Sequence, residues 1–209
     1  MVITAAAPVR KSKKELLSEW RHQEVLDAAR HIFAKLGYAA ANVEEIAKEA
    51  GMAKGTVYLY FKSKEEVFAA VLASDLESLT NRTIEGMSAA KTFREQITVF
   101  LELRLDYIRN NADFLNIYFA EFGSRGSRSP LIAGVIDREF QRGIEFLRKC
   151  LTEAIARGEL RAMPAEHAAF AIFDLARGFA ERHLRGWATI PLEEDFECTR
   201  TLILRGLRK

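Results

Sequence analysis

The stretch VEEIAKEAGMAKGTVYLYF, residues 43–61, decides the fold of the amino-terminal part of the chain. Its small and apolar residues have a fixed spacing, because Gly51 follows Ala47 by four residues and Val57 follows Gly51 by six. Two helices that cross steeply need a small side chain where they approach most closely, and Ala47 supplies it. Gly51 can adopt the positive φ that a turn of three or four residues requires. The spacing therefore predicts a helix-turn-helix whose second helix spans residues 54–60.

The outward face of this second helix carries residues suited to DNA, namely Lys54, Gly55, Thr56 and Tyr58. A glycine inside a helix costs about 1 kcal/mol relative to alanine, and a close approach of the backbone to DNA accounts for Gly55. The major groove accepts one α-helix, and the N-terminal residues of a recognition helix meet the base edges.

An alternative for this segment is a helical hairpin that lies in a core and binds nothing. Two tyrosines that we expect to be exposed, Tyr58 and Tyr60, argue against it. The lysines that flank them are Lys54, Lys62 and Lys64. Because tyrosine hydroxyls and ammonium groups at a helix edge suit phosphate oxygens, they favour the DNA-binding interpretation.

Helical periodicity continues along the rest of the chain and predicts an all-α protein of about nine helices. Three capping boxes mark helix starts: Asn42 with Glu45, Ser63 with Glu66, and Thr92 with Glu95. The predicted helices are residues 16–36, one that starts at Asn42, then 54–60, 64–85, 92–110, 112–123, 130–157, 164–187 and 192–207.

Composition and charge narrow the class of protein. The 209 residues carry a net charge of only +2, so a nucleic-acid footprint must be local. The two cysteines, Cys150 and Cys198, form no Cys-x-x-Cys pair and fit a reducing compartment. No signal peptide and no membrane span are expected, which predicts a soluble, cytoplasmic protein without a membrane partner.

The predicted domains are a basic flexible arm over residues 1–15, a helix-turn-helix DNA-binding domain over 16–63, and a helical ligand-sensing and dimerisation domain over 64–209. In the arm, Arg10, Lys11, Lys13 and Lys14 form a basic cluster. It either follows the DNA backbone or enters the minor groove, or it is a solvated tail. Both interpretations stay open.

An enzyme is not expected. None of the four histidines, His22, His31, His167 and His183, is spaced with cysteine or carboxylates in a way typical of zinc. No nucleophile elbow, phosphate-binding loop or dinucleotide fingerprint is present. No catalytic residue, cofactor or metal is therefore predicted.

Residues 21–72 closely resemble the N-terminal domain of the TetR (tetracycline-repressor) family. The stretch GMAKGTVYLYFKSKEEVF, residues 51–68, is nearly the family pattern, and Ala28-Ala29, Phe33 and Gly37-Tyr38 fit it too. Two departures affect capping rather than the motif: the family often has threonine where Asn42 stands and serine where Ala53 stands. An alanine cap costs on the order of 1 kcal/mol.

The resemblance implies an all-helical homodimer that represses transcription. It implies phosphate contacts from Asn42, Tyr58 and Lys64, and base contacts from Lys54, Gly55 and Thr56. It also implies that Tyr60 and Phe61 lock this domain to the fourth helix, which moves when a ligand binds in the C-terminal domain.

The C-terminal half is rich in aromatic residues, which form either plain core or, in part, the lining of an elongated apolar cavity for a small apolar or amphipathic effector. Charged residues in apolar runs are candidate polar contacts, although Asp174 and Arg177 could simply pair on one helix face. If Arg104 or Arg177 faces the cavity, an anionic or carbonyl-bearing ligand becomes plausible. The candidate ligand-binding residues are Phe100, Arg104, Tyr107, Tyr118, Phe122, Phe146, Phe173, Asp174 and Arg177.

The last two long helices are predicted to form the dimer interface. Small residues such as Ala169 and Ala176 allow close packing, and Leu202, Ile203 and Leu207 offer an apolar stripe. A two-fold axis would match a palindromic operator. The predicted function is a ligand-responsive, sequence-specific homodimeric repressor that binds a double-stranded DNA operator. The alternatives are control by a protein partner without a small-molecule inducer, and activation instead of repression.

Overall fold

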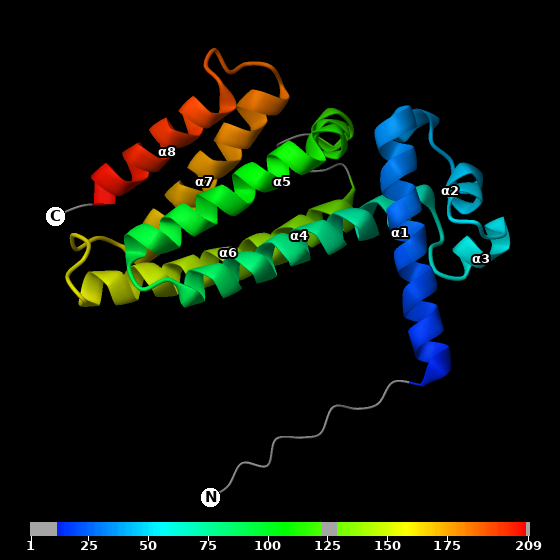
Figure 1. The fold of residues 1–209 in the computed structure, drawn as a ribbon, viewed down its shortest axis with the longest axis horizontal. Helices are drawn as coiled ribbons and strands as arrows, with labels where there is room; N and C mark the ends of the chain where they lie inside the picture. The colour runs from blue at the N-terminus through cyan, green and yellow to red at the C-terminus, as the bar shows by residue number, and fades with distance from the viewer. Residues whose placement is uncertain (1–11, 123–128, 208–209) are drawn as a thin grey trace, which may run out of the picture. The chain divides into compact units, whose positions relative to one another are not determined.

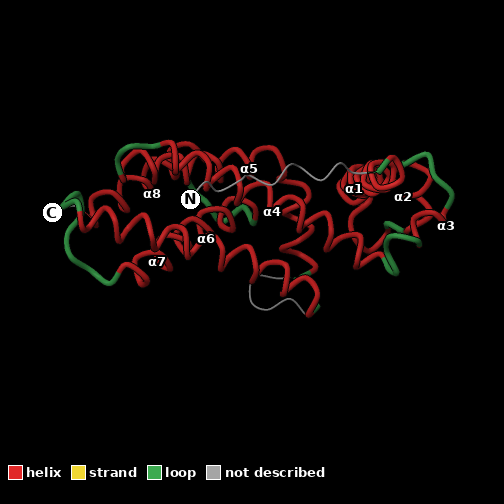
Figure 2. The backbone as a smooth tube through the Cα atoms, turned by 90° about the horizontal axis from the view of Figure 1, so that it is seen from below, coloured by secondary structure: helices red, strands yellow, loops and turns green. Residues whose placement is uncertain are grey.

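All secondary structure in the described residues, 12–122 and 129–207, is helical in this computed structural model, which confirms the all-α prediction (Figures 1 and 2). None of these helices is long and apolar enough to span a membrane. The helices are α1 Lys13–Ala40, α2 Val43–Glu49, α3 Lys54–Tyr58, α4 Lys64–Ala89, α5 Phe93–Glu121, α6 Pro130–Ala156, α7 Ala165–Leu184 and α8 Leu192–Leu207.

Several helix boundaries differ from the sequence prediction by a few residues, and two differences change the elements themselves. The helices expected at 92–110 and 112–123 are one element, α5, which is kinked at Asn111 (φ −132°, ψ 22°). The flexible arm was expected to reach residue 15, but Ser12 and Glu15 form a capping box, so α1 begins at Lys13. Lys13 and Lys14 therefore belong to a helix, whereas Arg10 and Lys11 lie outside the described residues.

The predicted capping boxes lie at the starts of α2, α4 and α5. The Asn42 side chain accepts a hydrogen bond from the Glu45 N–H at 2.9 Å, and Glu45 returns one at 3.2 Å. Thr92 and Glu95 do the same. The third box is half formed, because Ser63 caps the Glu66 N–H while the Glu66 carboxylate accepts from the N–H of Lys62.

The chain divides into two compact units between Val71 and Leu72. In the first, Val25, Ala29 and Phe33 of α1 are fully buried, as are Ile46 and Val57 on the next two helices. The Phe33 and Phe68 rings meet edge to face with centroids 5.2 Å apart, which fixes α1 against the start of α4.

The second unit is a helical bundle in which α7 packs against α5, α6 and α8. Its centre holds a row of rings: Phe173 lies 5.0 Å from Phe100 and 5.4 Å from Phe140, centroid to centroid. Asp195 is buried on α8 and accepts hydrogen bonds from Arg182 at 2.8 Å, and it lies 2.9 Å from the His183 ring nitrogen. This partly buried cluster joins α7 to α8.

Phe173 can enter the row because α6 has a glycine opposite it. A Cβ on Gly143 would lie 2.5 Å from the Phe173 ring, whereas a Cβ on Gly134 of the same helix would meet nothing within 4 Å. We expect Gly143→Ala to lower the free energy of unfolding by about 1–3 kcal/mol through overpacking. The control Gly134→Ala should raise it by about 0.5–1 kcal/mol through helix propensity. Denaturant unfolding measures both, and equal effects would contradict the steric argument.

Candidate DNA-binding surface and apolar cavity

The turn between α2 and α3 has the geometry that the residue spacing predicts. Gly51 has φ +64°, a left-handed conformation that glycine adopts without strain. The N–H of Met52 donates to the Ala47 carbonyl at 2.8 Å, which ends α2 and starts the reversal. Ala47 and Val57 are buried where the two helices meet. The predicted helix-turn-helix is therefore present, although α3 ends at Tyr58 rather than at residue 60.

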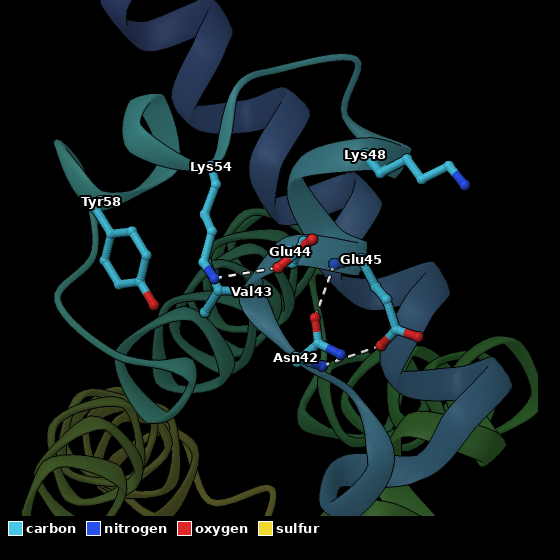
Figure 3. Close-up of a pocket in the computed structure, with 7 residues that line it drawn as sticks. All are labelled: Asn42, Val43, Glu44, Glu45, Lys48, Lys54 and Tyr58. Atoms are coloured by element: carbon cyan, nitrogen blue, oxygen red, sulfur yellow. Dashed lines mark hydrogen bonds and ion pairs between the residues drawn. The ribbon is translucent and has the colours of Figure 1, made fainter.

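The exposed side of this motif forms a hollow of about 560 Å³ (Figure 3). Lys54 and Tyr58 come from α3, and Lys54 Nζ lies 3.2 Å from a carboxylate oxygen of Glu44. Lys48 extends away from the other side chains. The lining residues are Asn42, Val43, Glu44, Glu45, Lys48, Lys54 and Tyr58.

The start of α3 is open to contact. Gly55 is exposed, and a Cβ there would meet nothing within 4 Å, so packing within the chain does not require glycine at this position. Thr56 is half-buried beside it. Ala53 makes no side-chain capping hydrogen bond. These features keep the backbone of α3 accessible from outside the protein.

Sequence reasoning did not single out Leu59, which is 82% exposed and is the most exposed large apolar side chain among the described residues. The exposure of Leu59 could have been predicted from its position relative to the buried residues of the motif. Val57 and Phe61 are buried, and a residue two positions from a buried one lies on the opposite side of a helix. Leu59 therefore had to point outward, next to Tyr58.

Lys64 has a different environment from the one expected for a phosphate contact. Its ammonium group donates to the carbonyls of Tyr38 at 2.6 Å, Ala39 at 3.2 Å and Ala41 at 2.9 Å. It also lies 4.5 Å from the Tyr38 ring centroid. These three acceptors account for the three donors of the ammonium group. Lys64 therefore holds the segment that leads into Asn42, whereas Lys62 is exposed.

The second unit contains an apolar cavity of about 190 Å³ among α4, α5, α6 and α7. Four of the nine predicted ligand-binding residues line it: Arg104, Tyr107, Phe173 and Arg177. Tyr107 lies at its edge, with its hydroxyl 3.5 Å from a carboxylate oxygen of Asp75. The remaining lining residues are Leu76, Leu79, Ile108, Leu115, Phe119, Phe140, Ala176 and Ala180.

Arg104 is the charged group most deeply placed in this cavity. Its guanidinium carbon lies 3.5 Å from the Phe100 ring centroid and 4.9 Å from that of Phe173. One N–H donates to the Phe100 carbonyl at 2.9 Å. Burial lowers the pKa of Arg104 to about 9, so the group keeps its proton at neutral pH.

The structure places the other five predicted residues away from the cavity wall. Phe100 lies in the core beneath Arg104. Phe146 lines a separate polar hollow of about 260 Å³, and Phe122 is the C-cap of α5. Tyr118 packs edge to face on its neighbour Phe119, and burial raises its pKa.

Asp174 is the fifth, and it is exposed on α7. Its carboxylate lies 3.5 Å from Arg177, which is the intrahelical pairing that the spacing of three residues allows. The described residues contain no group of three histidine, cysteine or acidic side chains positioned to hold a metal ion. Both cysteines are free, with Cys150 buried and Cys198 exposed.

Residues 25–71 match the family model described as "Bacterial regulatory proteins, tetR family". The "Fatty acid metabolism regulator protein" of Bacillus subtilis (strain 168) is 28% identical over 142 residues, which are 68% of this chain and 71% of that protein. The match and this relative confirm the resemblance seen in the sequence.

Solved structures share the fold. The TetR family transcriptional regulator PfmR from Thermus thermophilus has a TM-score of 0.66 at 26% identity, covering 88% of this chain and 99% of that chain. The transcriptional regulator FadR from Bacillus subtilis, solved in complex with stearoyl-CoA, has a TM-score of 0.75 at 23% identity, covering 90% and 100%.

The environment of Lys64 leads to a stability prediction. Lys64→Met leaves three carbonyls without their donor, and we expect the free energy of unfolding to fall by about 1–3 kcal/mol. Lys62→Met, two residues away, removes an exposed ammonium group and should change it by less than about 0.5 kcal/mol. Urea unfolding of both variants is the measurement. Equal stability of the two would show that Lys64 does not hold the segment before Asn42.

Proposed function

We propose that this TetR-family transcriptional regulator is a ligand-responsive repressor that binds a palindromic operator as a homodimer in the cytoplasm. The observation that carries the proposal is the exposed face of α3. This helix is the second helix of the helix-turn-helix, and its exposed face is available to the major groove. The apolar cavity of the second unit supports the ligand response, since a solid core would have favoured control by a protein partner instead.

The DNA contacts we propose divide into two groups. Lys54, Gly55 and Thr56 at the start of α3 reach base edges, because the N-terminal residues of a recognition helix enter the groove. Tyr58, whose side chain is 46% exposed, and Asn42, which precedes α2, lie at the edge of the same face and donate to phosphates. Lys62 adds an exposed positive charge.

Leu59 gives this surface an apolar contact. Leaving a leucine 82% exposed is unfavourable in water, whereas the C5-methyl group of thymine in the major groove offers an apolar partner. We therefore add Leu59 to the predicted DNA-reading residues. Glu44, paired with Lys54, occupies the same hollow and repels phosphates, so it restrains the lysine until DNA competes for it.

The effector we propose is small and amphipathic, because the cavity wall is apolar apart from Arg104, Arg177 and the Tyr107 hydroxyl. The comparisons point to fatty acyl chemistry in general: a Bacillus subtilis relative is named a fatty acid metabolism regulator, and the FadR structure from the same organism was solved with stearoyl-CoA. α4 contributes Leu76 and Leu79 to the wall, and Lys64 of the same helix holds the segment before Asn42. Ligand and DNA binding would then be coupled, and the coupling must be reciprocal.

The dimer we propose uses the outward faces of α7 and α8. Ala169, Ala176, Ile203 and Leu207, which the sequence suggested for the interface, are buried within the chain itself. The exposed large apolar residues on these two helices are Phe170, Leu175 and Leu202, at 36%, 42% and 66%. Large apolar side chains exposed on neighbouring helices suit burial against a second copy.

Operator binding tests the DNA-reading face. We expect the purified protein to bind a fluorescent palindrome from upstream of its own gene, with an affinity that falls as salt rises. Tyr58→Ala should weaken binding by about 10- to 100-fold, since a hydrogen bond to a charged phosphate contributes about 1.5–3 kcal/mol. Trp187→Ala removes a more exposed aromatic, 63% against 46%, from the loop between α7 and α8 and should bind as wild type does. Equal binding by wild type and Tyr58→Ala would refute the proposed face.

Light scattering tests the dimer. The molar mass measured for wild type should be twice that of the chain. Leu202→Arg should have the mass of one chain, because an unpaired charge at the interface is too costly to bury. Leu131→Arg alters another exposed leucine, on α6, and should remain dimeric. A dimeric Leu202→Arg variant would move the interface elsewhere.

A further inference from the structure

Arg104 has no acidic partner in the part of the chain that the structure describes. No carboxylate there lies within 4 Å of its guanidinium group, in contrast to Arg177, which pairs with Asp174 at 3.5 Å. Arginine carries five N–H donors in a rigid planar fork. One of them is used, by the Phe100 carbonyl at 2.9 Å. The remaining contacts are the faces of the Phe100 and Phe173 rings, at 3.5 and 4.9 Å.

Such an arrangement costs the apo protein stability. A buried charge is tolerated when an opposite charge and hydrogen bonds compensate its lost hydration, and ring faces compensate only part of it. A neutral residue such as leucine would fill this position of α5 at a lower cost. The charge is therefore explained by something that binds it, and the cavity that Arg104 lines is where that group would enter.

We propose that Arg104 binds the carboxylate of the effector, so that this protein senses a free amphipathic carboxylic acid rather than a neutral ester or thioester. The inference rests on the proposed ligand response and names the head group for it. A carboxylate neutralises the guanidinium group and accepts two parallel N–H bonds from its fork, which a thioester carbonyl cannot do.

The size of the cavity limits the apolar part of that acid. A closed apolar cavity of about 150 Å³ holds one benzene molecule, and this one measures about 190 Å³. Beyond Arg104 its wall is built from side chains such as Leu76, Leu115, Phe119 and Phe140, which offer no polar partner. The cavity therefore suits an aryl group or an alkyl chain of similar volume. This is far smaller than the whole of an acyl-CoA.

Arg177 is the other guanidinium group at the cavity and provides the matched control. Its side chain is 58% exposed and already faces Asp174, so its charge is hydrated and needs no ligand. If the head group were recognised by positive charge in general, the two arginines would contribute alike. If it is recognised by the half-buried guanidinium group that lacks a carboxylate partner, only Arg104 matters.

Calorimetry with chemically matched ligands tests the proposal. The probes are octanoate, decanoate and phenylbutanoate, the alcohols of the same carbon skeletons, and octanoyl-CoA and decanoyl-CoA. We expect wild type to bind at least one acid about 10- to 100-fold more tightly than its alcohol, as a charge-assisted contact predicts. Arg104→Met should lose this preference, while Arg177→Met should keep it. Arg104→Met should also unfold at the same or a higher temperature, which separates loss of recognition from loss of fold.

The outcomes separate this inference from the proposed function. Acids and alcohols that bind equally, an acid preference that survives in Arg104→Met, or thioesters that bind more tightly than the free acids would each overturn the carboxylate proposal. The ligand response would stand if those compounds still changed operator affinity. Absence of binding by every probe overturns the carboxylate proposal as well, and operator binding then decides separately whether the DNA-reading role stands.

Discussion

The burial of Val57 against Ile46 and Ala47 is the constraint on which the DNA-facing part depends. α3 has only five residues, which is too short to be stable alone, so this contact defines its orientation. Once Val57 and Phe61 are turned inward, helical geometry places Tyr58 and Leu59 outward. Gly51 makes the contact reachable, because its φ of +64° reverses the chain without strain. The burial of Val57 thus determines which residues of α3 are exposed.

Local rules explain which turns and helix starts could be predicted from the sequence. The turn at Gly51 and the caps at Asn42 and Thr92 each depend on residues within a few positions of one another, and the structure confirms them. Lys64 shows the limit of such reasoning. Its position fitted a phosphate contact, yet the carbonyls it binds lie 23 to 26 residues earlier in the chain. No local pattern reveals a partner at that separation.

The cavity could not be derived from the sequence for the same reason. Phe140 and Phe146 lie on one helix and look alike in the sequence, but only Phe140 reaches the apolar cavity, whereas Phe146 lines a separate polar hollow. What separates them is the packing of α6 on its neighbours, which depends partly on Gly143 facing Phe173. Asn111 is similar, since its break in helical dihedrals bends α5 without ending it. The aromatic content of the sequence predicted that a cavity could exist. Which residues line it depends on tertiary packing.

Gly55, Leu59 and Arg104 depart from local rules, and they lie at the two places where a ligand would act. Gly55 lowers the stability of α3, although no packing contact within the chain requires glycine there. Leu59 leaves an apolar side chain exposed to water. Arg104 holds a half-buried charge beside two rings with no carboxylate to meet it among the described residues. Each choice is unfavourable in the free protein, and each becomes favourable with a specific partner: a backbone in the groove, a thymine methyl group, a carboxylate. If the proposed DNA and effector both bind, each offsets one of these costs. Their coupling would require in addition that the effector change the affinity of the protein for DNA.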